Sequence, residues 1–204
     1  MILGLDYTIL SLIIVSFLLP FYIYRKRVFK FYYNKNNGAY FLKDLQIYLK
    51  NNHPKINFDF SKIDKINKSN PANLSTLLVL ENVAEQFINF EYIKRTQKAV
   101  SKDILWGSYE KESNPKNSTA NNLLRRKEIV LRRDSYKCNR CGKPIKLDTS
   151  MLLLIKDIED GGTYHFENLT VLCIDCNKVI HSQNPERLIK DLNIFYTLKK
   201  KYLK

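Results

Sequence analysis

The longest apolar run of the chain lies near its N-terminus, where residues 7–24 contain no charge and are rich in Leu, Ile, Val and Phe. With Ile2 to Leu5 added, the run reaches the ~20 residues that an apolar helix needs to cross a bilayer. No Lys or Arg precedes it, and it is followed at once by Arg25, Lys26, Arg27 and Lys30. A cleaved signal peptide would show a positive leading segment and a small-residue cleavage site, and neither is visible. The pattern predicts a single-pass membrane anchor over residues 1–30, with the N-terminus outside and the C-terminal domain in the cytoplasm.

Helical spacing of apolar residues recurs in the next third of the chain. Leu42, Leu45 and Leu49 predict a helix over residues 41–49, and the polar stretch 51–70 predicts a loop or short turn. Asn70-Pro71 is typical of a helix start. The following helix is predicted to run from about Ala72 towards Leu105 and to end at Trp106-Gly107. Residues 35–110 are therefore expected to form a helical region.

The remaining chain divides into a linker and a C-terminal module. Residues 111–121 lie in a polar stretch with one Pro and predict the linker. A helix is expected to begin near Ser118 or Thr119, and a basic amphipathic helix is expected to begin at Pro185. Together these predictions place a C-terminal module with flanking basic helices over residues 122–204.

The charge balance narrows the class of partner. The chain has 34 Lys and Arg against 20 Asp and Glu, a formal net charge of +14. This balance favours a polyanionic partner, either nucleic acid or the acidic face of a membrane. The alternative is a solvated surface in a chain rich in Asn and Lys.

The four cysteines form two pairs with the same spacing. Cys138 and Cys141 make one pair, Cys173 and Cys176 make the other, and the chain has only these four. The intervening 31 residues have the pattern of two short strands and a turn. Four thiolates brought together suit the tetrahedral geometry of structural zinc. In a reducing cytoplasm such pairs are metal ligands more often than disulfides.

Motifs around the cysteines extend this pattern. They are RDSYKCNRCGKPI, Gly161-Gly162, Glu167-Asn168-Leu169 and the stretch from Cys173 to Asn177. In this order they resemble the HNH endonuclease family over about 50 residues. The resemblance implies a ββα-metal fold, and hence an α+β class for the chain. In that fold two antiparallel strands and a helix hold one divalent cation, Mg²⁺ or Mn²⁺, against a scissile phosphate.

The resemblance also assigns roles to individual residues. It places Asn168 where the family orients a catalytic loop, and Asn177 and His181 where the family binds the catalytic metal. The family's metal-binding Asp and general-base His fall on Leu153 and Leu154. Leucine can neither accept a proton nor bind a cation. The general-base position is thus held by Leu154, and no intact catalytic set is expected.

A replacement for the missing base is sought nearby. His165 is the nearest histidine, eleven residues after Leu154. Asp157, Glu159 and Asp160 could supply carboxylates, although a solvated turn explains them equally well. His53 stands beside a proline in a polar stretch and is predicted to be incidental.

Two arginine pairs lead into the module and complete the predicted site. They are Arg125, Arg126, Arg132 and Arg133. We expect them to contact nucleic-acid phosphates, the alternative being an exposed helix face. The C-terminal Lys run could equally touch anionic lipid.

Three functions remain open on the sequence. The first is a membrane-anchored HNH-family protein that binds nucleic acid, with DNA expected, on the cytoplasmic side and has weak or lost cleavage. The second is an active metal-dependent DNA endonuclease, in defence against foreign DNA, that uses a relocated base such as His165. The third is a zinc-stabilised module that binds a protein partner at the membrane.

Overall fold

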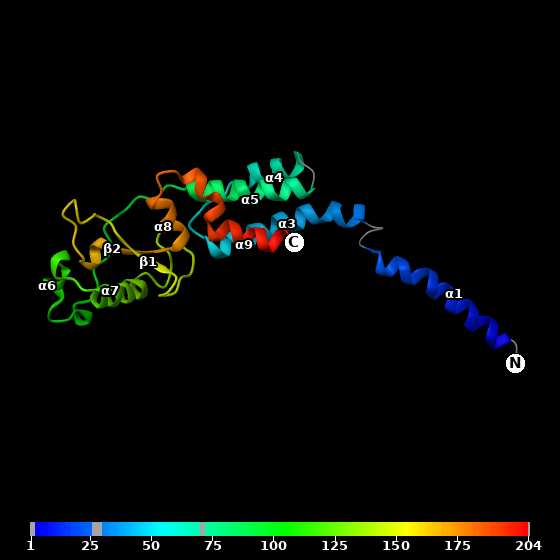
Figure 1. The fold of residues 1–204 in the computed structure, drawn as a ribbon, viewed down its shortest axis with the longest axis horizontal. Helices are drawn as coiled ribbons and strands as arrows, with labels where there is room; N and C mark the ends of the chain where they lie inside the picture. The colour runs from blue at the N-terminus through cyan, green and yellow to red at the C-terminus, as the bar shows by residue number, and fades with distance from the viewer. Residues whose placement is uncertain (1–2, 26–29, 70–71, 204) are drawn as a thin grey trace. The chain divides into compact units, whose positions relative to one another are not determined.

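The computed structural model describes residues 3–25, 30–69 and 72–203, and the chain falls into two compact units, Met1–Asp44 and Leu45–Lys204 (Figure 1). The first unit contains the helix α1 (Leu3–Ile23), in which Pro20 lies in the last turn. Its side chains from Tyr7 to Tyr24 are exposed. The helix α3 (Lys30–Asn52) contains the boundary between the units.

The predicted membrane span is not supported. Within residues 3–25, 30–69 and 72–203, no helix has both the length and the apolarity that a membrane crossing requires. Lys26 and Arg27 of the predicted basic flank lie outside the described residues. The orientation and location of the chain stay predictions.

Helices form one part of the second unit. The end of α3, α4 (Phe60–Ser69), α5 (Ala72–Asn89) and α9 (Asn193–Tyr202) lie side by side (Figure 1). Each of them contributes buried apolar residues to one core. The fully buried residues include Leu49 of α3, Val83 and Phe87 of α5, and Leu198 of α9. Their spacing along each helix gives the apolar stripe that packs a surface helix on a core.

Two expectations for this region are wrong. The polar stretch 51–70 contains α4, whose first turn is bonded to the Asp59 carboxylate through the backbone N–H of Ser61 (3.0 Å), and Ile63 anchors it in the core. The long helix expected towards Leu105 ends at Asn89. Residues 90–100 are irregular because they follow the surface of the C-terminal module, where Gln97 donates its backbone N–H to the carbonyl of Glu167 (2.8 Å). The predicted start at Asn70-Pro71 lies outside the described residues.

The second part of the unit is a small ββα module. It comprises α7 (Ala120–Arg133), β1 (Ser150–Leu154), β2 (Leu169–Cys173) and α8 (Ile174–His181). The strands are antiparallel, with Ser150 opposite Cys173 and Leu154 opposite Leu169. The two predicted strands and the predicted start of α7 are confirmed, since Thr119 caps this helix by accepting from the N–H of Asn122.

Short helices occupy the stretch predicted as a linker. These are α6 (Tyr109–Ser113) and the 3₁₀ turn η2 (Pro115–Asn117). Tyr109 is buried and its ring stacks on Phe166, with 5.2 Å between the centroids. This contact holds the segment on the module. Near the C-terminus, the 3₁₀ helix η4 (Pro185–Asp191) and then α9 take the place of the single amphipathic helix predicted from Pro185.

Candidate metal centre and adjoining cavity

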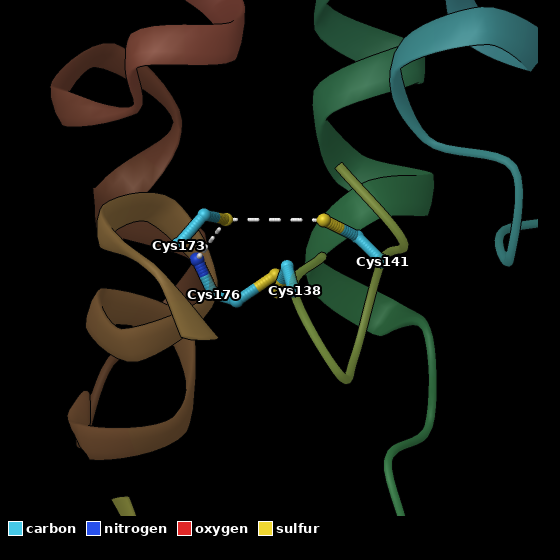
Figure 2. Close-up of side chains that lie close together, drawn as sticks. All are labelled: Cys138, Cys141, Cys173 and Cys176. Carbon is cyan, nitrogen blue, oxygen red and sulfur yellow. Dashed lines mark hydrogen bonds between the residues drawn. The ribbon is translucent and has the colours of Figure 1, made fainter. Parts of the chain in front are cut away.

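The four cysteines meet at one point between the N-terminus of α8 and the turn before β1. All four are free and buried, and their sulfur atoms lie within 4.8 Å of one another (Figure 2). The Sγ atoms of Cys141 and Cys173 are 3.8 Å apart. A tetrahedron with Zn–S bonds of ~2.3 Å has edges of ~3.8 Å, so the sulfur atoms fit a zinc ion.

The protonation of these thiols depends on their neighbours. A hydrogen bond from Cys141 lowers the pKa of Cys138, and the same bond raises the pKa of Cys141. Burial raises the pKa of Cys176. These opposite directions indicate that the four buried thiols do not all ionise together when no cation is present. A divalent metal that displaces the protons would provide this cation. The affinity of the cysteines for the metal would decrease as the pH falls.

The first cysteine pair is shaped by a glycine. Gly142 has φ of +80°, and a Cβ built on it would lie 2.8 Å from Cγ of Pro54. Only glycine fits both the backbone conformation and this close approach. The segment after α3 is thus packed directly on the cysteine turn, and Lys55 adds a backbone hydrogen bond to the carbonyl of Cys141 (3.2 Å).

Arg140, inside the first cysteine pair, joins the centre to α5. Its guanidinium is buried and donates to the carbonyls of Phe87 (2.7 Å), Ile88 (3.2 Å) and Phe90 (2.7 Å). A cation at a helix C-terminus satisfies orphan carbonyls and complements the helix dipole. The same group lies 3.6 Å from Sγ of Cys176, where its charge favours a thiolate.

Asp175, inside the second pair, has the corresponding role for α9. Its buried carboxylate accepts from the backbone N–H groups of Asn193 (2.8 Å) and Ile194 (3.0 Å). The N-cap residue of this helix, Leu192, has no side-chain acceptor, so Asp175 supplies the cap from elsewhere in the chain. The turn that contains Cys138 and Cys141 therefore caps α5, and the turn that contains Cys173 and Cys176 caps α9. Sequence reasoning missed Arg140 and Asp175, although a charged residue between two buried ligands is a visible signal.

A cavity of about 480 Å³ lies beside β1. Leu153 is buried and Leu154 is half-buried, and both line it. The other lining residues are Ala120, Leu123, Leu124, Lys127, Leu152, Asp157, Tyr164, Leu169 and His181. The cavity is mainly aliphatic.

Of the two residues predicted to bind a catalytic metal, one lines the cavity and the other does not. His181 reaches the cavity, and its Nδ1 lies 2.9 Å from the carbonyl of Asn177. Asn177 is not among the lining residues. Asp157, the lining carboxylate, lies 3.8 Å from Nζ of Lys94. Among the described residues, the four cysteines form the only cluster of three or more His, Cys, Asp or Glu side chains suited to a metal.

Asn168 holds the loop between the strands. Its amide donates to the carbonyls of Lys156 (2.9 Å) and Thr163 (2.7 Å), and its oxygen accepts from the N–H of Lys156 (2.7 Å). This geometry suits the loop-orienting role, which stays a prediction. The loop does not bring His165 into the cavity, because His165 is absent from the lining. Its Nε2 is instead 3.6 Å from Glu110, and its ring meets Tyr109 edge-on.

Arg126 has a structural role, contrary to the predicted phosphate contact. It is fully buried and donates to the carbonyls of Tyr164 (2.6 Å) and Tyr109 (3.1 Å) and to the side chain of Asn122 (2.5 Å). Its guanidinium also lies over three aromatic rings, the nearest being Tyr109 at 4.6 Å. A helical spacing shows which residues share a face and does not show that the face is buried.

Arg133 is likewise bonded within the protein. It donates to the carbonyls of Phe166 (2.7 Å), Leu169 (2.8 Å) and Lys98 (3.2 Å), and it pairs with Asp134. Arg125 and Arg132 are exposed. Arg125 lies over the ring of Trp106, and Arg132 pairs with Glu128. Of the four arginines predicted to contact phosphate, only these two have exposed side chains.

His53 is buried, which its polar sequence surroundings do not indicate. It is 1% exposed, its Nδ1 has no hydrogen-bond partner, and its ring meets Phe87 edge-on at 5.4 Å. Burial, with the nearby Lys143 charge, lowers the pKa of His53 to about 3. The imidazole is therefore neutral at physiological pH and packs as a core ring.

Comparison with known proteins agrees with the geometry. Residues 138–183 match the family model described as HNH endonuclease. The matched segment holds all four cysteines, both strands and α8. Searches of curated proteins and of solved structures found no match.

Proposed function

With residues 138–183 as an HNH endonuclease domain, we propose that this protein binds nucleic acid, with DNA as the expected form, and cleaves it weakly or not at all. The supporting observation is the pairing of a complete four-cysteine cluster with a leucine-lined cavity. The cluster supports the fold, and the cavity lacks the groups that would do the chemistry.

Phosphodiester hydrolysis in this fold has two requirements. A base must lie within hydrogen-bond reach of the attacking water, and a hard cation must be held by oxygen or imidazole ligands. The cavity presents leucines at the two central positions. Its remaining acid–base groups include His181, whose Nδ1 is next to a backbone carbonyl, and Asp157, which faces a lysine. Among the described residues, this set forms no cluster of three or more groups suited to a metal, which supports weak or absent cleavage.

A relocated base at His165 is not favoured. Its Nε2 faces Glu110, and its ring is edge-on to Tyr109. Catalytic groups have to be held within ~0.5 Å of their productive position. His165 would have to leave both neighbours to reach the cavity.

Binding is supported by charge and by the domain. The net charge of +14 favours a polyanion. Arg125 and Arg132 are exposed at the helix that leads into the domain. Binding through phosphate contacts should weaken steeply as salt rises.

The test combines cleavage and binding on the same zinc-loaded full-length protein. Plasmid DNA with Mg²⁺ or Mn²⁺ should show no nicking above a metal-only blank. A labelled duplex should bind in a fluorescence anisotropy titration at 50 mM salt and dissociate towards 200 mM. Robust nicking that disappears in His181→Ala would overturn the proposal that the protein cleaves DNA weakly or not at all. Absence of binding at low salt would overturn the nucleic-acid assignment.

A double substitution sharpens the test of the cavity. Leu153→Asp with Leu154→His restores the side chains that the family has at these positions. If only the central pair is missing, this variant should gain metal-dependent nicking, and Leu153→Asn with Leu154→Gln is the matched polar control. Equal activity of both variants would show that the pair is not the cause of inactivity.

A further inference from the structure

A second recess, of about 380 Å³, lies on the module and shares no lining residue with the leucine-lined cavity. It is formed by three segments far apart in the sequence. All of its lining residues are polar, and they are Lys55, Gln97, Lys98, Arg133, Asp134, Ser135, Lys137 and Asn139. No aliphatic or aromatic residue lines it, so the recess favours a polar ligand.

Hydrogen bonds hold part of the lining of this recess in place. The amide of Asn139 donates to the side chains of Gln97 (2.8 Å) and Thr170 (2.8 Å). Its backbone N–H donates to the carbonyl of Val171 (3.0 Å), which ties it to β2. Arg133 is fixed by three carbonyls of the surrounding chain. Side chains that are already fixed lose little conformational entropy when a ligand binds, which favours affinity.

The charge of the recess is positive and largely uncompensated. Its one carboxylate, Asp134, is neutralised by Arg133, with Nε 2.8 Å from Oδ1. Lys98 and Lys137 are exposed, and neither has an ion-pair partner in the part of the chain that the structure describes. Lys55 donates to the carbonyl of Asn139 (2.7 Å) and pairs with no acid among the described residues.

We propose that this recess binds a phosphate group of the nucleic-acid backbone, outside the leucine-lined cavity. The proposal rests on the proposed function and adds a contact site to it. Lysines recognise phosphate as point charges, and amide and hydroxyl groups add directional donors. Phosphate contacts fix the position of a strand without reading its sequence. A recess without a stacking ring suits the backbone and not the bases.

The experiment uses the zinc-loaded full-length protein and a labelled DNA duplex. In Lys98→Gln with Lys137→Gln, two phosphate contacts are lost, so the slope of log K against log salt should fall in magnitude by roughly 1.8. Lys111→Gln with Lys116→Gln removes the same charge from exposed lysines that do not line the recess and should leave the slope nearly unchanged. Zinc content and melting temperature are checked for each protein. Equal slopes for the two variants, or an unchanged slope in the recess variant, would overturn the proposal.

A second arm separates this proposal from the proposed function. Inorganic phosphate is titrated against the wild type and the recess variant by NMR. Saturable shifts at Lys98 and Lys137 of the wild type, absent from the variant, support a phosphate site even if the protein binds no DNA. Duplex binding with no phosphate-dependent shift and no effect of the variant would leave the proposed function standing and remove the recess from it.

Discussion

The cysteine cluster and the leucine-lined cavity belong to the same small module and differ in what they retain. The cluster has all four ligands, buried and within 4.8 Å of one another. The cavity is lined by Leu153 and Leu154, at the two positions where the sequence resemblance predicts a metal ligand and a base. In this fold, the groups that shape the backbone and the groups that do the chemistry are different residues. One set can be lost while the other is kept.

The difference is physically reasonable. A structural zinc site contributes folding free energy directly, so loss of one ligand removes the fold. A polar residue beside β1 contributes little to folding, since it would lie in a cavity with few partners. Replacing it by leucine fills space with an aliphatic side chain, which a small core tolerates.

The largest expected effect is on the cluster. Cys176→Ser, or removal of zinc by a chelator, should unfold the module because zinc binding in small domains is worth ~10–16 kcal/mol. Circular dichroism melting and zinc analysis measure the loss. Ser182→Ala, just beyond α8, is the control and should melt like the wild type. A cooperative melt at the wild-type temperature in the zinc-free protein would contradict the structural role.

Arg140 is the next test, because it connects the cluster to α5. Arg140→Met removes a buried guanidinium and leaves three carbonyls without their donor, so the free energy of unfolding should fall by about 3 to 5 kcal/mol. Denaturant titration measures it. Arg125→Met, at an exposed position, should change stability by less than about 1 kcal/mol. Arg140→Lys should rescue only in part, since an ammonium cannot reproduce the planar fork. Wild-type stability of Arg140→Met would show that Arg140 does not stabilise the connection between the cluster and α5.

The buried His53 predicts an acid dependence of stability. Its folded pKa is about 3, against 6.5 for the free side chain, so the unfolded state binds more protons between these values. Stability should therefore fall as pH drops below about 6.5, by up to about 1.4 kcal/mol per pH unit. The thiols add their own acid dependence through zinc. The His53→Leu variant isolates the histidine part, and denaturant titrations from pH 6.5 to 5 should show a shallower slope for it. Identical slopes would contradict a buried neutral imidazole.

The smallest expected effect is in the cavity. Leu154→His places an imidazole at a half-buried position beside a cavity large enough for water, so stability should change by less than about 1 kcal/mol. Differential scanning calorimetry compares it with Leu172→His, a fully buried neighbour on β2 that should lose several kcal/mol. A large loss in Leu154→His would show that the leucine supports the fold and would narrow the difference between the two regions.

The parts of this fold that were predictable are those with local signals. The cysteine spacing, the two strands and the Thr119 cap are each set by residues close in sequence. The internal hydrogen bonds of Arg126, Arg133 and Arg140 were not predictable in this way. Each of these arginines donates to carbonyls more than ten residues away, and a sequence pattern does not show which carbonyls are left free by other elements.

The candidate site also combines features that the local sequence shows with features that depend on long-range contacts. The positions of Leu153 and Leu154 relative to the cysteine pairs can be read from the sequence, and their assignment to the catalytic pair stays a prediction. The orientation of His165 towards Glu110, and the burial of His53 against Phe87, depend on segments that meet only in the folded chain. The end of α5 at Asn89 also needed the structure, because its capping group comes from Arg140 rather than from the residues that follow it.

The bonds of Arg140 and Asp175 bear on how this protein can be divided for study. A fragment that starts at residue 122 would keep all four cysteines but would leave the Arg140 guanidinium without its three acceptors. One that stops before residue 193 would strip the Asp175 carboxylate of both its donors. The shortest piece worth expressing therefore runs from about residue 45 to the end of the chain.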